Sequence, residues 1–128
     1  MDEGYGFAEV TGEPGVTWTG PVIYRITIRG VGVYVGKTRD PRRPLRDYWR
    51  NVANLVAGRP YRKGKVDGYR RIHLEMAAAV RGGVPIDLHA LENVPEDALG
   101  SRERYWIGYC RAQAVASGLV SLNGNDGG

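Results

Sequence analysis

Two tyrosines ten residues apart, Tyr24 and Tyr34, are the first side chains whose type and spacing favour chemistry. Each lies in a run rich in β-branched and aromatic residues, and Arg29 and Gly30 separate the two runs. This pattern predicts a tight β-hairpin whose strands cover residues 22–28 and 31–35. The hairpin would place one phenol hydroxyl on each of two adjacent strands.

Tyr34 shares its strand face with two positions that carry no side chain, Gly32 and Gly36, because side chains alternate along a strand. Two hydroxyls on neighbouring strands, one of them flanked by glycine, could bracket a ligand that approaches the backbone closely. The alternative is that both tyrosines only fill the half-buried face of a small sheet.

One carboxylate, Glu103, stands at the head of an apolar helix face. The face is formed by residues that recur at helical spacing: Trp106, Ile107, Cys110 and Ala114. A carboxylate there is paired, placed at the helix N-terminus for the dipole, or used in chemistry. The ordinary alternative is an acid in a first helical turn, flanked by two arginines.

Basic residues are concentrated in one stretch of this chain. Residues 37–71 contain twelve Lys and Arg against three Asp, whereas residues 1–20 contain four acids and no Lys or Arg. Such a segment predicts a polyphosphate partner, namely nucleic acid, with a generic basic surface or an acidic protein partner as alternatives. The candidate contacts are Arg39, Arg42, Arg50, Arg59, Arg62, Lys63, Lys65, Arg70 and Arg71.

Length and composition narrow the class of protein. The chain has 128 residues, a net charge of +4 and a sequence pI near 9.4, which fits one domain with a modest core. A single cysteine, Cys110, excludes an internal disulfide and a multi-cysteine zinc site. The acidic first residues do not resemble a signal peptide, and no segment is long and apolar enough to span a membrane. We expect a cytoplasmic protein.

The elements that must position these residues can be outlined from the sequence. We expect an α+β fold (an α/β sandwich) with a small, mainly antiparallel three-stranded sheet flanked by about three main helices. Residues 1–20 read as a loose N-terminal extension with a short strand near 16–19, and residues 21–128 as a single domain. After the hairpin we expect a helix that begins at Pro44 and ends near Gly58, a basic loop over 58–68, a helix over 68–81, a strand over 85–91, a helical turn at Pro95, and a helix over 102–116 capped by Ser101.

These pieces together resemble the GIY-YIG nuclease superfamily. Val22-Ile23-Tyr24 is similar to the first family motif, and Tyr34-Val35-Gly36, followed by Lys37, is similar to the second. Glu103 resembles the single metal-binding glutamate of the third helix, and Asn123 resembles the asparagine that commonly follows it. The resemblance covers roughly residues 21–126 and implies a catalytic site of Tyr24, Tyr34, Lys37, Glu103 and Asn123.

The resemblance is weakest at the arginine that many members carry early in their first helix. Pro44 occupies that position here, so Arg43 and Arg46 are the nearest substitutes, and Tyr48 stands where the family often has histidine. Tyr48 and His73 are candidate supporting residues, although a lone helical histidine is more often structural.

The resemblance implies hydrolysis of phosphodiester bonds with one divalent cation, Mg²⁺ or Mn²⁺, held by Glu103. Tyr24 would be the general base or water-positioning group, Tyr34 would orient the water or phosphate, and an arginine would bind the non-bridging oxygens. We therefore expect a Mg²⁺-dependent DNA endonuclease of restriction, phage or mobile-element, or repair type, with homodimerisation as one route to double-strand cleavage. The alternative is a non-catalytic nucleic-acid-binding module with the same fold.

Overall fold

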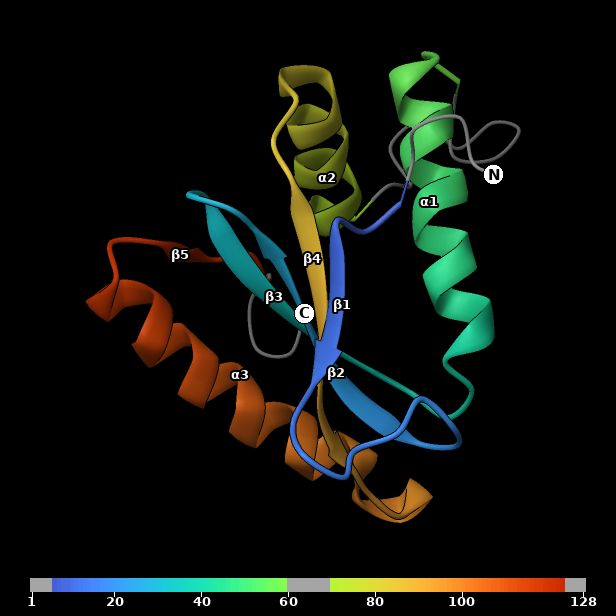
Figure 1. The fold of residues 1–128 in the computed structure, drawn as a ribbon, viewed down its shortest axis with the longest axis vertical. Coiled ribbons are helices and arrows are strands. Elements are labelled where there is room, and N and C mark those ends of the chain that lie inside the picture. Colours follow the sequence, from blue (N-terminus) through green and yellow to red (C-terminus); the bar gives the residue numbers. More distant parts are fainter. Residues whose placement is uncertain (1–5, 60–69, 124–128) are drawn as a thin grey trace.

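The computed structural model describes residues 6–59 and 70–123, without the side chains of 42–44. A five-stranded mixed sheet has the strand order β1-β4-β2-β3-β5, with α1 and α2 on one face and α3 on the other (Figure 1). The strands are β1 (Glu9–Gly12), β2 (Val22–Ile28), β3 (Gly32–Thr38), β4 (Ile86–Asn93) and β5 (Val120–Ser121). The helices are α1 (Arg42–Val56), α2 (Arg71–Gly82), the 3-10 turn η1 (Glu96–Ala98) and α3 (Leu99–Ala116).

The hairpin of β2 and β3 lies at the centre of the sheet and confirms the sequence prediction. The two strands pair antiparallel, with Tyr24 opposite Gly36 and Ile26 opposite Tyr34. Alternation gives each strand two apolar faces. One face, which includes both tyrosines, packs against α1 and α2, and the other, which includes Ile23 and Val35, packs against α3.

The sheet is larger than the expected three antiparallel strands, so the finer part of that prediction is wrong. The order β4-β2-β3 is antiparallel, but β1 pairs parallel with β4 and β5 pairs parallel with β3. The expected strand near 16–19 is absent from the described residues, and the N-terminal extension contributes β1 at Glu9–Gly12 instead. Residues near Thr17 are held by the Asn93 side chain, whose Oδ1 accepts from the Thr17 amide at 2.8 Å.

The helices follow the predicted order, with shifted starts. α1 begins at Arg42 after Pro41, before the expected Pro44, and Gly58 follows its end with a positive φ of 78°. α3 begins at Leu99, directly after η1, so Ser101 lies inside the helix and does not cap it. The Ser101 hydroxyl donates to the Ala98 carbonyl at 3.3 Å. Most of the expected basic loop over 58–68 lies outside the described residues.

Among the helices in the described part of the chain, none has the length and apolar character to cross a membrane.

Candidate functional site

Three tyrosine rings meet on the face of the sheet that carries α1 and α2. The hydroxyls of Tyr24 and Tyr48 are 2.8 Å apart and share a hydrogen bond. The ring of Tyr48 makes edge contacts with the rings of Tyr24 and Tyr34, at centroid distances of 6.3 and 6.4 Å. The Tyr34 hydroxyl accepts a hydrogen bond of 3.1 Å from the Arg70 guanidinium. The structure thus brings the two predicted tyrosines together and adds Tyr48 and Arg70 to them.

Gly36 leaves room for the ring of Tyr24. A Cβ at residue 36 would lie 2.6 Å from both Cζ and the hydroxyl oxygen of Tyr24. The sequence pattern assigned this side-chain-free position to the approach of a ligand. In the structure the space is filled by Tyr24 itself, so Gly36 positions the Tyr24 hydroxyl.

Burial keeps two of these phenols neutral. Tyr24 is 2% exposed, and burial raises the pKa of its phenol well above the ordinary value of 10, while the nearby Tyr34 and Glu103 add smaller effects in the same direction. Burial likewise raises the pKa of Tyr48 well above its ordinary value. At neutral pH both hydroxyls therefore retain their protons.

Lys37 and Glu103 form an ion pair on the α3 side of the sheet. The Lys37 ammonium donates to Glu103 Oε1 at 2.7 Å. Glu103 is 6% exposed and lies among the apolar residues of α3, as predicted, so the carboxylate required a partner. Its other oxygen, Oε2, accepts no hydrogen bond from the described residues, and it is not among the fully buried side-chain atoms that lack a partner.

Asn123 fixes the free edge of β3. Beyond the two residues that β5 covers, the backbone of Val35 has no strand partner on that side within residues 6–59 and 70–123. The Asn123 side chain replaces the missing strand, because its Oδ1 accepts from the Val35 amide at 2.9 Å and its Nδ2 donates to the Val35 carbonyl at 2.8 Å. Asn123 thus holds in place the strand that carries Tyr34, Gly36 and Lys37.

His73 supports the cluster from α2. Its ring contacts the Tyr48 ring at 5.6 Å, and its Nδ1 accepts from the backbone amide of Arg70 at 3.2 Å. Its Nε2 lies 3.4 Å from the side-chain nitrogen of Asn51. Burial, aided by the charge of Arg70, lowers the pKa of His73 to about 4. The imidazole is neutral at pH 7 and holds Arg70 at the start of the helix.

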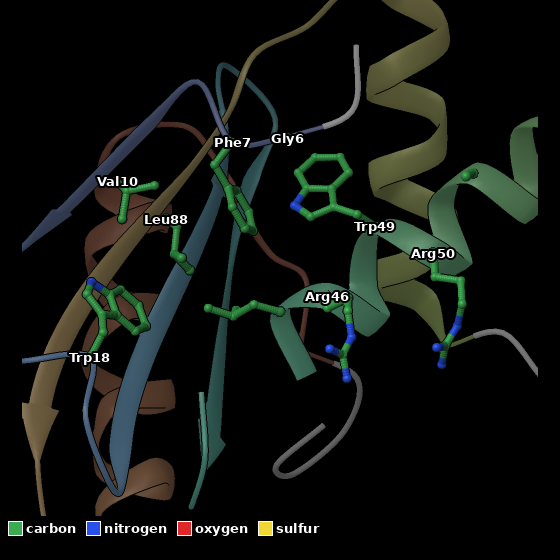
Figure 2. A pocket seen from close by; sticks show the side chains of 10 residues that line it. Gly6, Phe7, Val10, Trp18, Arg46, Trp49, Arg50 and Leu88 are labelled. Carbon is green, nitrogen blue, oxygen red and sulfur yellow. The ribbon is translucent and has the colours of Figure 1, made fainter. Parts of the chain in front are cut away.

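Arg70 is the arginine that contacts the tyrosines in the described part of the chain. Arg46, one of the two predicted catalytic arginines, lines a pocket beside α1 together with Trp49 and Arg50 (Figure 2). The other, Arg43, belongs to α1, but its side chain lies outside the description. Sequence analysis placed Arg70 only among the nucleic-acid contacts, because no spacing rule connects it to Tyr34, 36 positions away.

The predicted nucleic-acid contacts divide into three groups. Four have a side-chain partner within the protein: Arg39 with Glu96, Arg50 with Asp47, Arg59 with Asn54, and Arg71 with Glu75. Arg70 faces the tyrosines. The remainder are not described by the structure, in whole or at the side chain: Arg42, Arg62, Lys63 and Lys65. Several arginines of the basic stretch are therefore already bound to side chains of the protein itself, which the sequence alone does not indicate.

A divalent cation is compatible with these residues only if it takes few ligands from the protein. No group of three or more His, Cys, Asp or Glu side chains gathers within residues 6–59 and 70–123. Glu103 offers one carboxylate oxygen, Oε2, that accepts no hydrogen bond from the described residues. This donor set suits Mg²⁺, which keeps several waters and takes further oxygens from a bound phosphate.

The chain was also compared with protein-family models, with curated proteins and with solved structures, and none of them matches it. The likeness to GIY-YIG nucleases consequently rests on the motif residues and their placement.

Proposed function

We propose that this protein is a DNA endonuclease that hydrolyses phosphodiester bonds at the end of β3, with a divalent cation held by Glu103. One observation carries the proposal. Within the described residues three polar or charged side chains are buried, His73, Glu103 and Asn123. Glu103 and Asn123 belong to the predicted catalytic set, and His73 was a candidate supporting residue. Burying such groups is costly, and two of them bind the strand that carries Tyr34: Glu103 pairs with Lys37, and Asn123 bonds to the Val35 backbone.

The proposed roles follow from the contacts. Tyr24 is neutral, so its hydroxyl positions the attacking water by hydrogen bonding and does not act as a preformed phenolate. Arg70, already directed at the Tyr34 hydroxyl, binds the non-bridging oxygens of the phosphate. Asn123 keeps the edge of β3 in register. A cation bound by Glu103 would compensate the charge that develops on the phosphate.

Lys37 has a second function in this scheme. In the structure it neutralises Glu103, since its ammonium lies 2.7 Å from Oε1. When a phosphate binds, Lys37 turns to the phosphate oxygens and leaves the carboxylate free. The Lys37 side chain is 42% exposed, whereas that of Glu103 is 8% exposed, so Lys37 is the partner with freedom to move.

The decisive experiment replaces the carboxylate while preserving its shape. Glu103→Gln retains a hydrogen-bond acceptor for Lys37 but removes the charge, so cleavage of plasmid DNA in Mg²⁺ should fall by at least about 10²-fold, with DNA affinity within about threefold of the wild type. The matched control is Glu96→Gln, which makes the same change at the exposed pair with Arg39 and should cleave at the wild-type rate. Equal rates for the wild type and Glu103→Gln would exclude the proposal.

A non-catalytic nucleic-acid-binding module is the second candidate, and a specific observation favours it. Glu103 is paired with Lys37, and the buried Tyr24 hydroxyl is hydrogen-bonded to Tyr48, so both groups have partners within the protein. For such a module, binding of DNA should be the same in Mg²⁺ and in EDTA, and plasmid, supercoiled and branched substrates should all stay intact. Cleavage that requires Mg²⁺ and Glu103 would exclude this alternative.

A further inference from the structure

A hollow of about 640 Å³ lies between α1, β4 and the segment that precedes β1 (Figure 2). Its volume falls within the range of ligand pockets, roughly 300–1,000 Å³. The walls are predominantly apolar and include three aromatic rings and two leucines: Phe7, Trp18, Trp49, Leu45 and Leu88. Phe7 and Trp49 meet edge to face at 4.9 Å. Of the predicted catalytic residues the lining includes Arg46, but it includes none of the groups given a role in the proposed hydrolysis: Tyr24, Tyr34, Lys37, Arg70, Glu103 and Asn123.

One polar atom in the wall lacks a partner. The indole nitrogen of Trp49 is buried and has no hydrogen-bond acceptor among the described residues. Figure 2 shows this nitrogen on the side of the ring that faces Phe7. A buried donor that is left unpaired costs about 1–3 kcal/mol. A ligand in the hollow whose acceptor oxygen reached this nitrogen would recover this free energy.

Two arginines give the hollow a positive rim. Arg46 and Arg50 extend from successive turns on the same side of α1 (Figure 2). Arg50 is partly neutralised by Asp47, at 2.9 Å. Arg46 is exposed and forms no ion pair with any described residue. The rim thus has a net positive charge beside an apolar interior.

We propose that this hollow binds a hydrophobic organic anion, with its apolar body between Phe7, Trp18 and Trp49 and its carboxylate at Arg46. Three features of the hollow favour this class of ligand. The aromatic rings would bury an apolar body, the indole N–H of Trp49 would donate to an oxygen, and the Arg46 guanidinium would pair with the carboxylate. A strongly polar ligand would leave its own groups unpaired against the walls. The inference is independent of the proposed nuclease activity.

The test follows the three indole N–H signals by NMR while the full chain is titrated with octanoate and, separately, with 1-octanol. Trp18, Trp49 and Trp106 are the only tryptophans, and their signals are assigned with Trp→Phe variants. Octanoate should shift the Trp49 and Trp18 signals and leave Trp106, on α3, unchanged. Arg46→Gln should weaken the affinity for octanoate by about 10-fold and leave the affinity for 1-octanol unchanged. Arg111→Gln on α3 should change neither affinity.

Three results would overturn the inference. The first is the absence of any shift of Trp49 at millimolar octanoate. The second is equal affinity for octanoate and 1-octanol, which would show that the rim does not select an anion. The third is displacement of octanoate by a short DNA oligonucleotide with the same shift of Trp49, which would make the hollow part of the DNA path.

Discussion

The hydroxyls of Tyr24 and Tyr48 share one hydrogen bond, yet only Tyr24 is assigned to the attacking water. Replacing either tyrosine by phenylalanine leaves the other hydroxyl buried without its partner, so each variant should lose about 1–3 kcal/mol of unfolding free energy. Cleavage should separate them. Tyr24→Phe should slow cleavage by about 10²-fold or more, and Tyr48→Phe by less than about 10-fold, in single-turnover assays with Mg²⁺.

This pair is an internal control, because equal stability losses remove unfolding as an explanation for a difference in rate. If Tyr24→Phe cleaves as fast as Tyr48→Phe, the Tyr24 hydroxyl has no role beyond packing. That result would restore the simpler interpretation of the hairpin tyrosines as the buried face of a sheet.

His73 should make the stability of the protein depend on pH. Its pKa is lowered from 6.5 to about 4 by burial and by Arg70, so between these values the unfolded chain binds more protons than the folded one. Stability is therefore fully present above pH 6.5 and is lost as the pH falls towards 4. By pH 5 the loss should be about 1–2 kcal/mol, after allowance for solvent screening.

Urea unfolding of the wild type and of His73→Gln at pH 7.5 and pH 5 measures this effect. The variant keeps polar groups near Asn51 and Arg70 but does not titrate, so its loss between the two pH values should be smaller by that amount. Identical losses would mean that His73 is accessible to protons in the folded protein. Because carboxylates titrate in both proteins, only the difference between the two is informative.

At the scale of single residues, sequence analysis could identify motif residues but not the contacts between distant ones. Glu103 was recognisable because a carboxylate interrupted an apolar helical stripe. Its partner Lys37 is 66 positions away, and the link between Arg70 and Tyr34 crosses from the start of α2 to β3. Such pairs follow from how the helices cover the sheet, which local spacing does not encode.

The β2–β3 hairpin depends as an element on Gly36. A Cβ at this position would lie 2.6 Å from the end of the Tyr24 ring, so Gly36→Ala should force the ring away and break its hydrogen bond with Tyr48. We expect a loss of about 1–3 kcal/mol in unfolding free energy and a fall in cleavage as large as that of Tyr24→Phe.

Gly108→Ala is the matched control for this substitution. Gly108 lies in α3, and a Cβ there would meet no atom within 4 Å, so alanine should leave cleavage unchanged and stabilise the helix by up to about 1 kcal/mol. A Gly36→Ala variant with wild-type stability and cleavage would show that the Tyr24 ring has another position to occupy.

Elements with a strong hydrophobic period were predictable, and those defined by pairing alone were not. The apolar face of α1 has a clear helical period and β2 is rich in β-branched residues, and the prediction of both elements is confirmed. β1 is fully exposed, with Val10 as its one large apolar residue, and β5 has only two residues. Both are strands because they pair with a neighbour: β1 pairs with β4, and β5 pairs with β3. Propensity within four residues or fewer cannot signal this.

At the scale of the whole molecule, acidic side chains lie along the β1 edge of the sheet, whereas Arg70 contacts Tyr34 of β3. The β1 edge carries acids that already have partners: Glu9 and Asp87 lie next to Arg29, and Glu13 next to His89. Arg70 lies away from these acids and donates a hydrogen bond to the hydroxyl of Tyr34 on β3. We therefore expect DNA to approach the β3 edge and to avoid the β1 edge.

The salt dependence of DNA binding tests this division. Each phosphate neutralised by a cation contributes about −0.9 to the slope of log K against log salt. Arg70→Gln removes one such contact, so the slope should become less negative by about 0.9. Arg29→Gln makes the same chemical change at the β1 edge, where Asp87 holds the guanidinium with two hydrogen bonds of 2.7 and 2.9 Å, and should leave the slope unchanged.

Fluorescence anisotropy of a labelled duplex, titrated from 50 to 300 mM salt in EDTA to prevent cleavage, gives both slopes. A reduced slope for Arg29→Gln with an unchanged one for Arg70→Gln would place the DNA on the opposite edge of the sheet, away from Glu103. The proposed active site could not then act on it.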